Sequence, residues 1–297
     1  MNNKFARVYP AVVTPFNEDG TFCFAAAKKH ADWMLSEGLT GLGILMASGE
    51  YQSVSMEEHK AYVREMLPYL KDRASIIVGC SRERPEDVVE LMENARECGA
   101  DAAMVLPSFY YRMSQNELIK HYQYINDHSD LDILVYNNPF CSSSIEPETL
   151  DEICKLEHVK IVKETSSRID VMTDFIFRVP EQVGIMCGCD YLLYQAYATG
   201  AIGWISMTAN ILPKMATAFH KAMLEEHDYA KGLALYRKMY PVLNVMERFP
   251  KPTQAVKYIL KEVIGIDVGT VRRPRYELND EEKRYVLEAT HIRELLD

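Results

Sequence analysis

The sequence predicts an α/β protein that folds as a closed (β/α)8 barrel with a C-terminal helical appendage. Short apolar stretches alternate with amphipathic ones eight times, at steps of roughly 20 to 35 residues. Strands that are apolar on both faces belong to parallel sheets covered by helices, and eight such units close into a TIM barrel. A doubly wound open sheet is the competing arrangement, disfavoured because no G-x-G-x-x-G follows a predicted strand.

The first elements have clear boundary residues. The first predicted strand, at 9–16, is interrupted by prolines and runs into an Asn-Glu-Asp-Gly turn. The helix after it has apolar residues at helical spacing over 25–36 and stops at Gly38. The next helix opens on a capping box at 55–58 and extends to about Leu70.

The later units repeat the alternation. A helix over 85–99 begins with Pro85 in its first turn and closes at Gly99. Short apolar runs predict further strands at 41–45, 74–79, 102–106, 132–136, 159–163, 184–187 and 203–206. Helical spacing predicts further helices at 115–127, 146–155, 169–178, 190–199, 211–226, 229–246, 253–263 and 280–296. Because strand patterns fade after 211, we divide the chain into a barrel domain, 1–226, and a C-terminal helical region, 227–297.

Composition limits the class of protein. The chain has 297 residues, of which 48% are hydrophobic and 26% charged, which is typical of a globular protein. Its net charge of -10 argues against nucleic acid as a partner, since binding phosphate backbones needs a dense basic patch. No apolar run approaches the ~18 residues of a membrane span, and no apolar segment follows Met1–Lys4. We therefore expect no membrane association and a cytoplasmic location.

The seven cysteines indicate reduced thiols rather than disulfides. Their number is odd, they are scattered, and most lie in apolar runs. Cys187 and Cys189 form the closest pair, but no second pair and no histidine lie nearby, which makes a zinc site improbable. We expect no metal and no other cofactor.

Lys163 is the residue around which the candidate chemistry gathers. It ends an apolar run that begins at Val159, where a lysine is out of place. Burying an ammonium is costly, so such a lysine tends to become a neutral amine, which is a nucleophile toward carbonyl groups. Lys163 is thus a candidate Schiff-base lysine. The alternative is that it only caps the strand and reaches water, as we expect for Lys160.

Lys163 is one of several candidate site residues that lie at or just after the ends of the predicted strands. In a barrel of this type, functional residues lie at the carboxyl ends of the strands. The residues there are Ser48, Gly49, Glu50, Tyr110, Tyr136, Lys163, Gly188, Asp190 and Ile205. The turn Ala47–Gly49 can direct N–H groups and a hydroxyl toward a small carboxylate, and Tyr136 can move a proton. Singly, each is more often an ordinary turn or rim residue.

Together these segments resemble one family, the class I aldolases and lyases typified by dihydrodipicolinate synthase and N-acetylneuraminate lyase. The resemblance covers nearly the whole chain. It rests on the segments Thr14-Pro15-Phe16, Ser48-Gly49-Glu50, Pro107-Ser108-Phe109-Tyr110-Tyr111, Tyr136-Asn137-Asn138-Pro139, Ile161-Val162-Lys163-Glu164-Thr165, Gly203-Trp204-Ile205-Ser206 and Thr208-Ala209-Asn210.

The resemblance implies a Schiff-base lyase or aldolase that acts on pyruvate and an aldehyde. It implies that Lys163 forms an imine with pyruvate, that Tyr136 relays protons, and that Tyr110 reaches a neighbouring subunit's site across a tight dimer, usually within a tetramer. It further assigns substrate binding to Ala47, Ser48, Thr165, Gly188, Asp190 and Ile205.

Three departures from the family pattern affect the substrate. The proton-relay hydroxyl is replaced by Ala47, so a water or Ser48 has to substitute. The arginine that clamps the second substrate of dihydrodipicolinate synthases is replaced by Cys141. Sialic-acid-type lyases have an acidic residue and a serine where this chain has Tyr191 and Met207.

We therefore predict an acceptor pocket lined by Met46, Cys141 and Met207, with Trp204 beside them. A carboxylated aldehyde needs a fixed cation, and only Arg112 is a nearby candidate. We rank an uncharged, rather apolar aldehyde first. The alternatives are 4-hydroxy-tetrahydrodipicolinate synthesis, cleavage of a sugar acid such as N-acetylneuraminate, and a catalytically retired barrel that binds a keto acid.

A homodimer or homotetramer is also expected. The cluster Phe109-Tyr110-Tyr111 would expose an apolar patch on a loop, and such patches usually mark interfaces. The sequence does not choose between the two assemblies.

Overall fold

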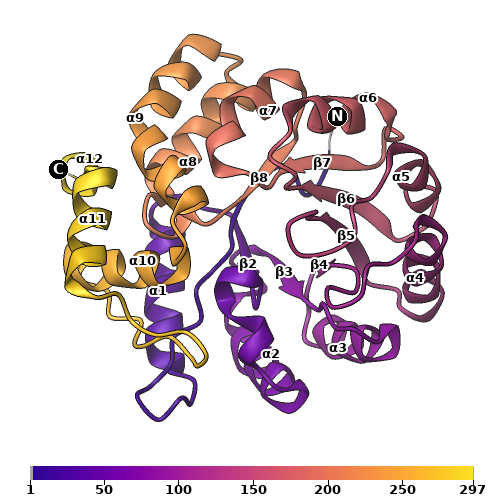
Figure 1. Ribbon diagram of the computed structural model, residues 1–297, viewed down its shortest axis with the longest axis horizontal. Helices are drawn as coiled ribbons and strands as arrows, with labels where there is room; N and C mark the ends of the chain where they lie inside the picture. The colour runs from indigo at the N-terminus through magenta and orange to yellow at the C-terminus, as the bar shows by residue number, and fades with distance from the viewer. Residues whose placement is uncertain (1–2, 297) are drawn as a thin grey trace.

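The computed structural model describes residues 3–296 and confirms the (β/α)8 barrel. Eight parallel strands form one sheet in the order β1-β8-β7-β6-β5-β4-β3-β2. A parallel bridge between Ala11 and Gly43 joins the two ends of this order and closes the barrel. Figure 1 shows the strands at the centre, the barrel helices outside them, and the C-terminal helices along one flank.

The elements follow the predicted alternation closely. The strands are β1 (Val8–Pro10), β2 (Gly41–Ile44), β3 (Ser75–Gly79), β4 (Ala102–Val105), β5 (Asp132–Asn137), β6 (Val159–Glu164), β7 (Gly184–Cys187) and β8 (Gly203–Ser206). The barrel helices are α1 (Phe24–Ser36), α2 (Met56–Leu70), α3 (Pro85–Glu97), α4 (Gln115–His128), α5 (Pro147–Ile153), α6 (Ile169–Arg178), α7 (Leu193–Thr199) and α8 (Pro213–His220). The C-terminal helices are α9 (Tyr229–Arg248), α10 (Pro252–Ile259), α11 (Asp280–Thr290) and α12 (Ile292–Leu296).

Several predicted elements had wrong boundaries, among them the helix expected at 253–263, which is α10 followed by a π-helical turn over Leu260–Ile264. The first strand covers only Val8–Pro10, and of the predicted remainder only Ala11 and Phe16 take part in isolated bridges. The helix expected at 211–226 is α8 followed by a π-helical turn that ends at Glu225. The helix expected at 280–296 is divided at His291, whose φ of 50° belongs to the left-handed region.

Alternation along the strands creates two cores. Side chains of a strand point alternately to the two sides of the sheet. In β6, Ile161 therefore packs inside the barrel and Val162 packs against the helices. Leu134 and Tyr136 of β5 also lie inside. The same two-residue step directs Lys163 from β6 into the carboxyl end of the barrel interior.

The C-terminal region is joined to the barrel by a buried ion pair. Nζ of Lys257, in α10, lies 2.9 Å from Oε1 of Glu50, and the two side chains are 2% and 0% exposed. Lys257 Nζ also donates to the carbonyls of Thr14, at 2.8 Å, and Thr270, at 2.6 Å. Within residues 3–296, no helix is long and apolar enough to cross a membrane.

Candidate active site

Lys163 is enclosed by the barrel instead of reaching solvent. It is 6% exposed and pairs in register with Tyr136 of the neighbouring strand. Its Nζ lies 4.2 Å from the centre of the Tyr136 ring, and it donates no hydrogen bond to another residue of the described range 3–296. Lys160, by contrast, is half-buried and donates to the carbonyl of Glu157 at 2.6 Å. The two lysines of one strand therefore have different environments.

Gly188 has no side chain, and this leaves room for the side chain of Lys163. A Cβ atom at residue 188 would lie 2.8 Å from Cε of Lys163 and 1.9 Å from Oγ1 of Thr165. Both separations are too short for carbon, so any side chain there would displace the lysine. Thr165 Oγ1 is buried beside it and has no hydrogen-bond partner within the described residues. Such an orphaned hydroxyl next to the amine is suited to contact a bound substrate.

Tyr136 has its hydroxyl fixed by Asn138. Asn138 Nδ2 donates to the phenolic oxygen at 2.8 Å. The tyrosine is 5% exposed, and its own O–H proton remains available for another acceptor. It lines the same cavity as Lys163, which suits proton transfer to an oxygen on a lysine-bound substrate.

The loop after β2 forms a tight turn, and the Ser48 hydroxyl in this turn already donates a hydrogen bond within the protein. Residues Ala47–Gly49 form one turn of 3-10 helix, and Ser48 Oγ donates to the carbonyl of Ala11 at 2.7 Å. Ser48 is 2% exposed, so its hydroxyl is directed into the protein. The next residue, Glu50, has a φ of 58° and carries the carboxylate that pairs with Lys257.

The carboxylate of Asp190 accepts hydrogen bonds from residues in and just after β8 and so holds the end of this strand. Its Oδ1 accepts from Trp204 Nε1 at 3.0 Å, and its Oδ2 accepts from both N–H and Oγ1 of Thr208, at 2.9 and 2.5 Å. Burial raises the pKa of Asp190, which these hydrogen bonds and the Lys163 charge oppose. Trp204 lies in the layer between sheet and helices, so its expected place in the acceptor wall is wrong.

The predicted residues line two adjoining cavities. The larger, of about 540 Å³, is lined by Met46, Ala47, Ser48, Tyr136, Lys163, Thr165, Gly188, Asp190, Ile205 and Met207. The smaller, of about 420 Å³, is lined by Tyr110 and Cys141 and shares Ala47 and Tyr136 with the larger one. Cys141 is thus separated from Met46 and Met207, with which it was expected to form one wall.

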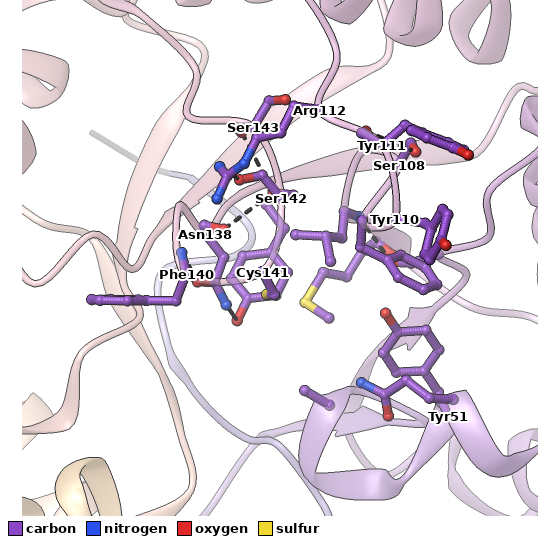
Figure 2. A pocket seen from close by; sticks show the side chains of 17 residues that line it. Tyr51, Ser108, Tyr110, Tyr111, Arg112, Asn138, Phe140, Cys141, Ser142 and Ser143 are labelled. Atoms are coloured by element: carbon purple, nitrogen blue, oxygen red, sulfur yellow. Dashed lines mark hydrogen bonds between the residues drawn. The ribbon is translucent and has the colours of Figure 1, made fainter.

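Figure 2 shows the smaller cavity, with Cys141 near its centre and Phe140 pointing away from it. Arg112 donates to the carbonyls of Ser142 and Pro139, so its guanidinium binds the backbone of the loop after β5. Tyr110 is 77% exposed at the rim. Burial raises the pKa of the Cys141 thiol, which the charges of Lys163 and Arg112 partly oppose.

Sequence reasoning missed two charged residues at the larger cavity, Glu247 and Arg248. Both come from the last turn of α9 and line the cavity with Lys163. Glu247 Oε2 accepts the N–H of Asp190 at 2.8 Å, and the Arg248 guanidinium lies 5.3 Å from the centre of the Tyr191 ring. The expectation that only Arg112 could supply a cation is therefore wrong. No motif marks this turn, because it belongs to a helix far along the chain.

Comparison with known proteins identifies the family of this chain. The sequence model of the Dihydrodipicolinate synthetase family matches residues 4–292. The 4-hydroxy-tetrahydrodipicolinate synthases of Novosphingobium aromaticivorans and Ruegeria pomeroyi are each 31% identical; the alignments cover 95% of this chain and 95% of the first relative, and 92% and 93% for the second.

Solved structures give the same result. A dihydrodipicolinate synthase from Bacillus anthracis superposes with a TM-score of 0.91 at 25% identity, over 97% of this chain and 98% of that one. A monomeric dihydrodipicolinate synthase variant superposes with a TM-score of 0.88 at 25% identity, over 97% of each chain. Sequence and fold together place this chain in the dihydrodipicolinate synthetase family, whose members are lyases of the class I aldolase type.

Proposed function

We propose that Lys163 attacks the keto group of pyruvate, or of a similar 2-keto acid, and carries it as an imine. The observation that supports this most is a buried amine that has no hydrogen-bond partner within residues 3–296 and lies in a cavity of about 540 Å³. The amine adds to the carbonyl carbon to give a carbinolamine, and loss of water then gives the imine.

Tyr136 is the group proposed to move protons during these steps. Its free O–H proton can be given to the carbinolamine oxygen as water leaves. Ser48 does not suit the missing relay position, because its hydroxyl donates to Ala11. A water in the space beside the Ala47 methyl is the remaining candidate, since both cavities meet there.

Other residues that line the cavity of Lys163 are proposed to orient the keto acid. Its carboxylate is proposed to accept hydrogen bonds from the backbone N–H groups of Ala47 and Ser48. Thr165 Oγ1, which has no hydrogen-bond partner among the described residues, can donate to the same substrate. Ile205 and Gly188 line the cavity beside Lys163, and Asp190 holds the end of β8, the strand that carries Ile205.

The defining experiment is reductive trapping. Borohydride added with pyruvate should give a stable adduct on Lys163, located by peptide mapping. An unmodified Lys163 in the presence of pyruvate would refute the mechanism and favour a barrel that only binds keto acids.

For the second substrate, we propose an aldehyde with an uncharged, apolar chain. Met46, Met207 and Met246 supply thioether surface to the larger cavity, and Cys141 supplies no charge to the smaller one. Arg248 favours a second candidate, 4-hydroxy-tetrahydrodipicolinate synthesis, because its guanidinium can pair with a carboxylate at the cavity mouth. The names of the curated relatives favour it too.

Kinetics with three aldehydes decide between these candidates. Pyruvate is supplied with an aromatic aldehyde, with aspartate semialdehyde, and with N-acetylmannosamine as the sugar-derived acceptor. Turnover of the semialdehyde near the ~10⁴–10⁸ M⁻¹s⁻¹ of enzymes on their own substrates would identify the synthase. In that case Arg248→Gln should raise KM for the semialdehyde by at least about tenfold, whereas it should leave the aromatic aldehyde unaffected.

A homodimer or homotetramer is proposed from the exposed aromatic rim. Phe109, Tyr110 and Tyr111 are 39%, 77% and 75% exposed, and Phe140 is 71% exposed across the smaller cavity. Packing a second subunit here would bury these rings and bring its Tyr110 to this site. Sedimentation at micromolar concentration tests it, with a monomer as the contrary result. The seven free cysteines fit action in the reducing cytoplasm.

A further inference from the structure

The C-terminal region contributes an acid to the cavity that holds Lys163. Glu247 lies in the last turn of α9, and its Oε2 is held by the N–H of Asp190 at 2.8 Å. Its Oε1 makes no hydrogen bond or ion pair within residues 3–296, and the side chain lines the same cavity as Lys163 and Ile205. One carboxylate oxygen is thus anchored, while the other has no partner among the described residues and belongs to a side chain that lines the cavity of Lys163.

The surroundings of Glu247 suit proton transfer near neutral pH. Burial, and then the charge of Asp190, raise its pKa to about 7, while the Asp190 N–H and the Lys163 charge act in the opposite direction. Asp190 cannot take this role, because both of its oxygens accept hydrogen bonds from Trp204 and Thr208. A carboxyl group whose pKa lies near the working pH is an effective base and acid.

Tyr136 is assigned above to the carbinolamine oxygen, and the remaining candidate groups are less suitable than Glu247. Ala47 has no hydroxyl, and the Ser48 hydroxyl is used by Ala11. Burial raises the pKa of Tyr51 above its usual range, so this phenol keeps its proton. With the keto-acid carboxylate placed at the 47–48 turn, the rest of the cavity, which Gly188 and Glu247 line, is available to the methyl group.

We propose that Glu247 is the base that removes a methyl proton from the pyruvate imine on Lys163, a step that rests on the function proposed above. The electrons of the C–H bond form the carbon–carbon double bond of the enamine, and the electrons of the C=N bond move to nitrogen. Glu247 Oε1 takes the proton. In the reverse step Glu247 returns a proton to the same carbon, so the residue is unchanged after one cycle.

The test uses deuterium exchange at the pyruvate methyl group, followed by NMR in D₂O without any aldehyde. The wild type should exchange these protons, and the rate should rise as pH passes about 7. Glu247→Gln should slow exchange by about 10²-fold or more and abolish this pH dependence. Borohydride trapping on Lys163 should remain, which shows that the variant is folded and still forms the imine.

Two further variants complete the design. Glu247→Asp should recover part of the exchange rate, because it restores a carboxyl group. Glu288→Gln, an exposed change on α11, should behave as the wild type. Wild-type exchange by Glu247→Gln would overturn the proposal, and so would a wild type that traps pyruvate but exchanges nothing. A wild type that traps no pyruvate would refute the imine itself and, with it, any base acting on it.

Discussion

At two places a lysine and a glutamate, one from the barrel and one from the C-terminal region, lie near each other, but within residues 3–296 only Lys257 and Glu50 of these four form an ion pair. Lys257 of α10 places its ammonium between Glu50 Oε1, at 2.9 Å, and the carbonyls of Thr14 and Thr270. Lys163 of β6 has the reverse arrangement, because the barrel supplies the lysine and α9 supplies Glu247.

All three N–H donors of the Lys257 ammonium have partners, whereas the described residues offer no hydrogen-bond partner to Lys163. A buried ammonium with three partners is stable and unreactive, since any reaction would break those bonds. A buried amine that lacks partners beside an open cavity can bond to a ligand instead. Both lysines are buried. What distinguishes the structural Lys257 from the proposed catalytic Lys163 is therefore whether the N–H donors of the side chain have hydrogen-bond partners.

Replacing Lys163 should have the largest effect on function. Lys163→Met removes the amine but keeps the apolar stem, so turnover and borohydride trapping should fall on the order of 10⁴-fold or more. Stability in urea should be unchanged or higher, because a costly buried ammonium is gone. A trapped adduct on this variant would show that another lysine reacts, and it would contradict the catalytic role that distinguishes Lys163 from Lys257.

Replacing Lys257 should have the largest effect on stability. Lys257→Met leaves the Glu50 carboxylate buried without its partner, which should cost roughly 3–5 kcal/mol of unfolding free energy. Urea denaturation measures this loss. Adding Glu50→Gln should recover part of it, and the double-mutant cycle gives the coupling. A loss below about 1 kcal/mol would contradict the structural role.

Replacing Glu247 should stabilise the protein at alkaline pH. Its folded-state pKa of about 7 exceeds the ~4.3 of an exposed glutamate, so folding favours the protonated form. That contribution is complete below about pH 4 and is lost as pH rises through 7. Glu247→Gln mimics the protonated acid, so its advantage should be absent at pH 4 and reach roughly 1–3 kcal/mol at pH 8.

Thermal or urea unfolding at both pH values measures this difference. The Glu288→Gln variant is the control and should show no dependence on pH. Equal stability of wild type and Glu247→Gln at pH 8 would show that Glu247 is not desolvated by its surroundings.

Replacing Lys160 should have the smallest effect. Its side chain is half-buried, and its ammonium donates to the Glu157 carbonyl at the protein surface. Lys160→Ala should change unfolding free energy by no more than about 0.5 kcal/mol and leave trapping on Lys163 intact. If borohydride no longer trapped pyruvate on Lys163 in this variant, Lys160 would be required for the reaction of Lys163, contrary to this prediction.

Much of the site was predictable because it depends on local patterns. The two-residue period of a strand places Leu134 with Tyr136, and Ile161 with Lys163, on one side of the sheet. Parallel strands bring their carboxyl ends to one edge, so Ala47, Gly188 and Ile205 had to meet there. The resemblance of these segments to one family follows from the same spacing.

Only the tertiary structure determines which charged side chains lie at that edge of the barrel. Asp190 and Glu247 are far apart in sequence, and only the packing of α9 brings the Glu247 carboxylate to the Asp190 N–H. The engagement of Ser48 with Ala11 and the separation of Cys141 from Met207 likewise depend on loops from different strands. Side-chain periodicity carries information over a few residues, whereas these contacts arise from how whole elements pack, which no local pattern encodes.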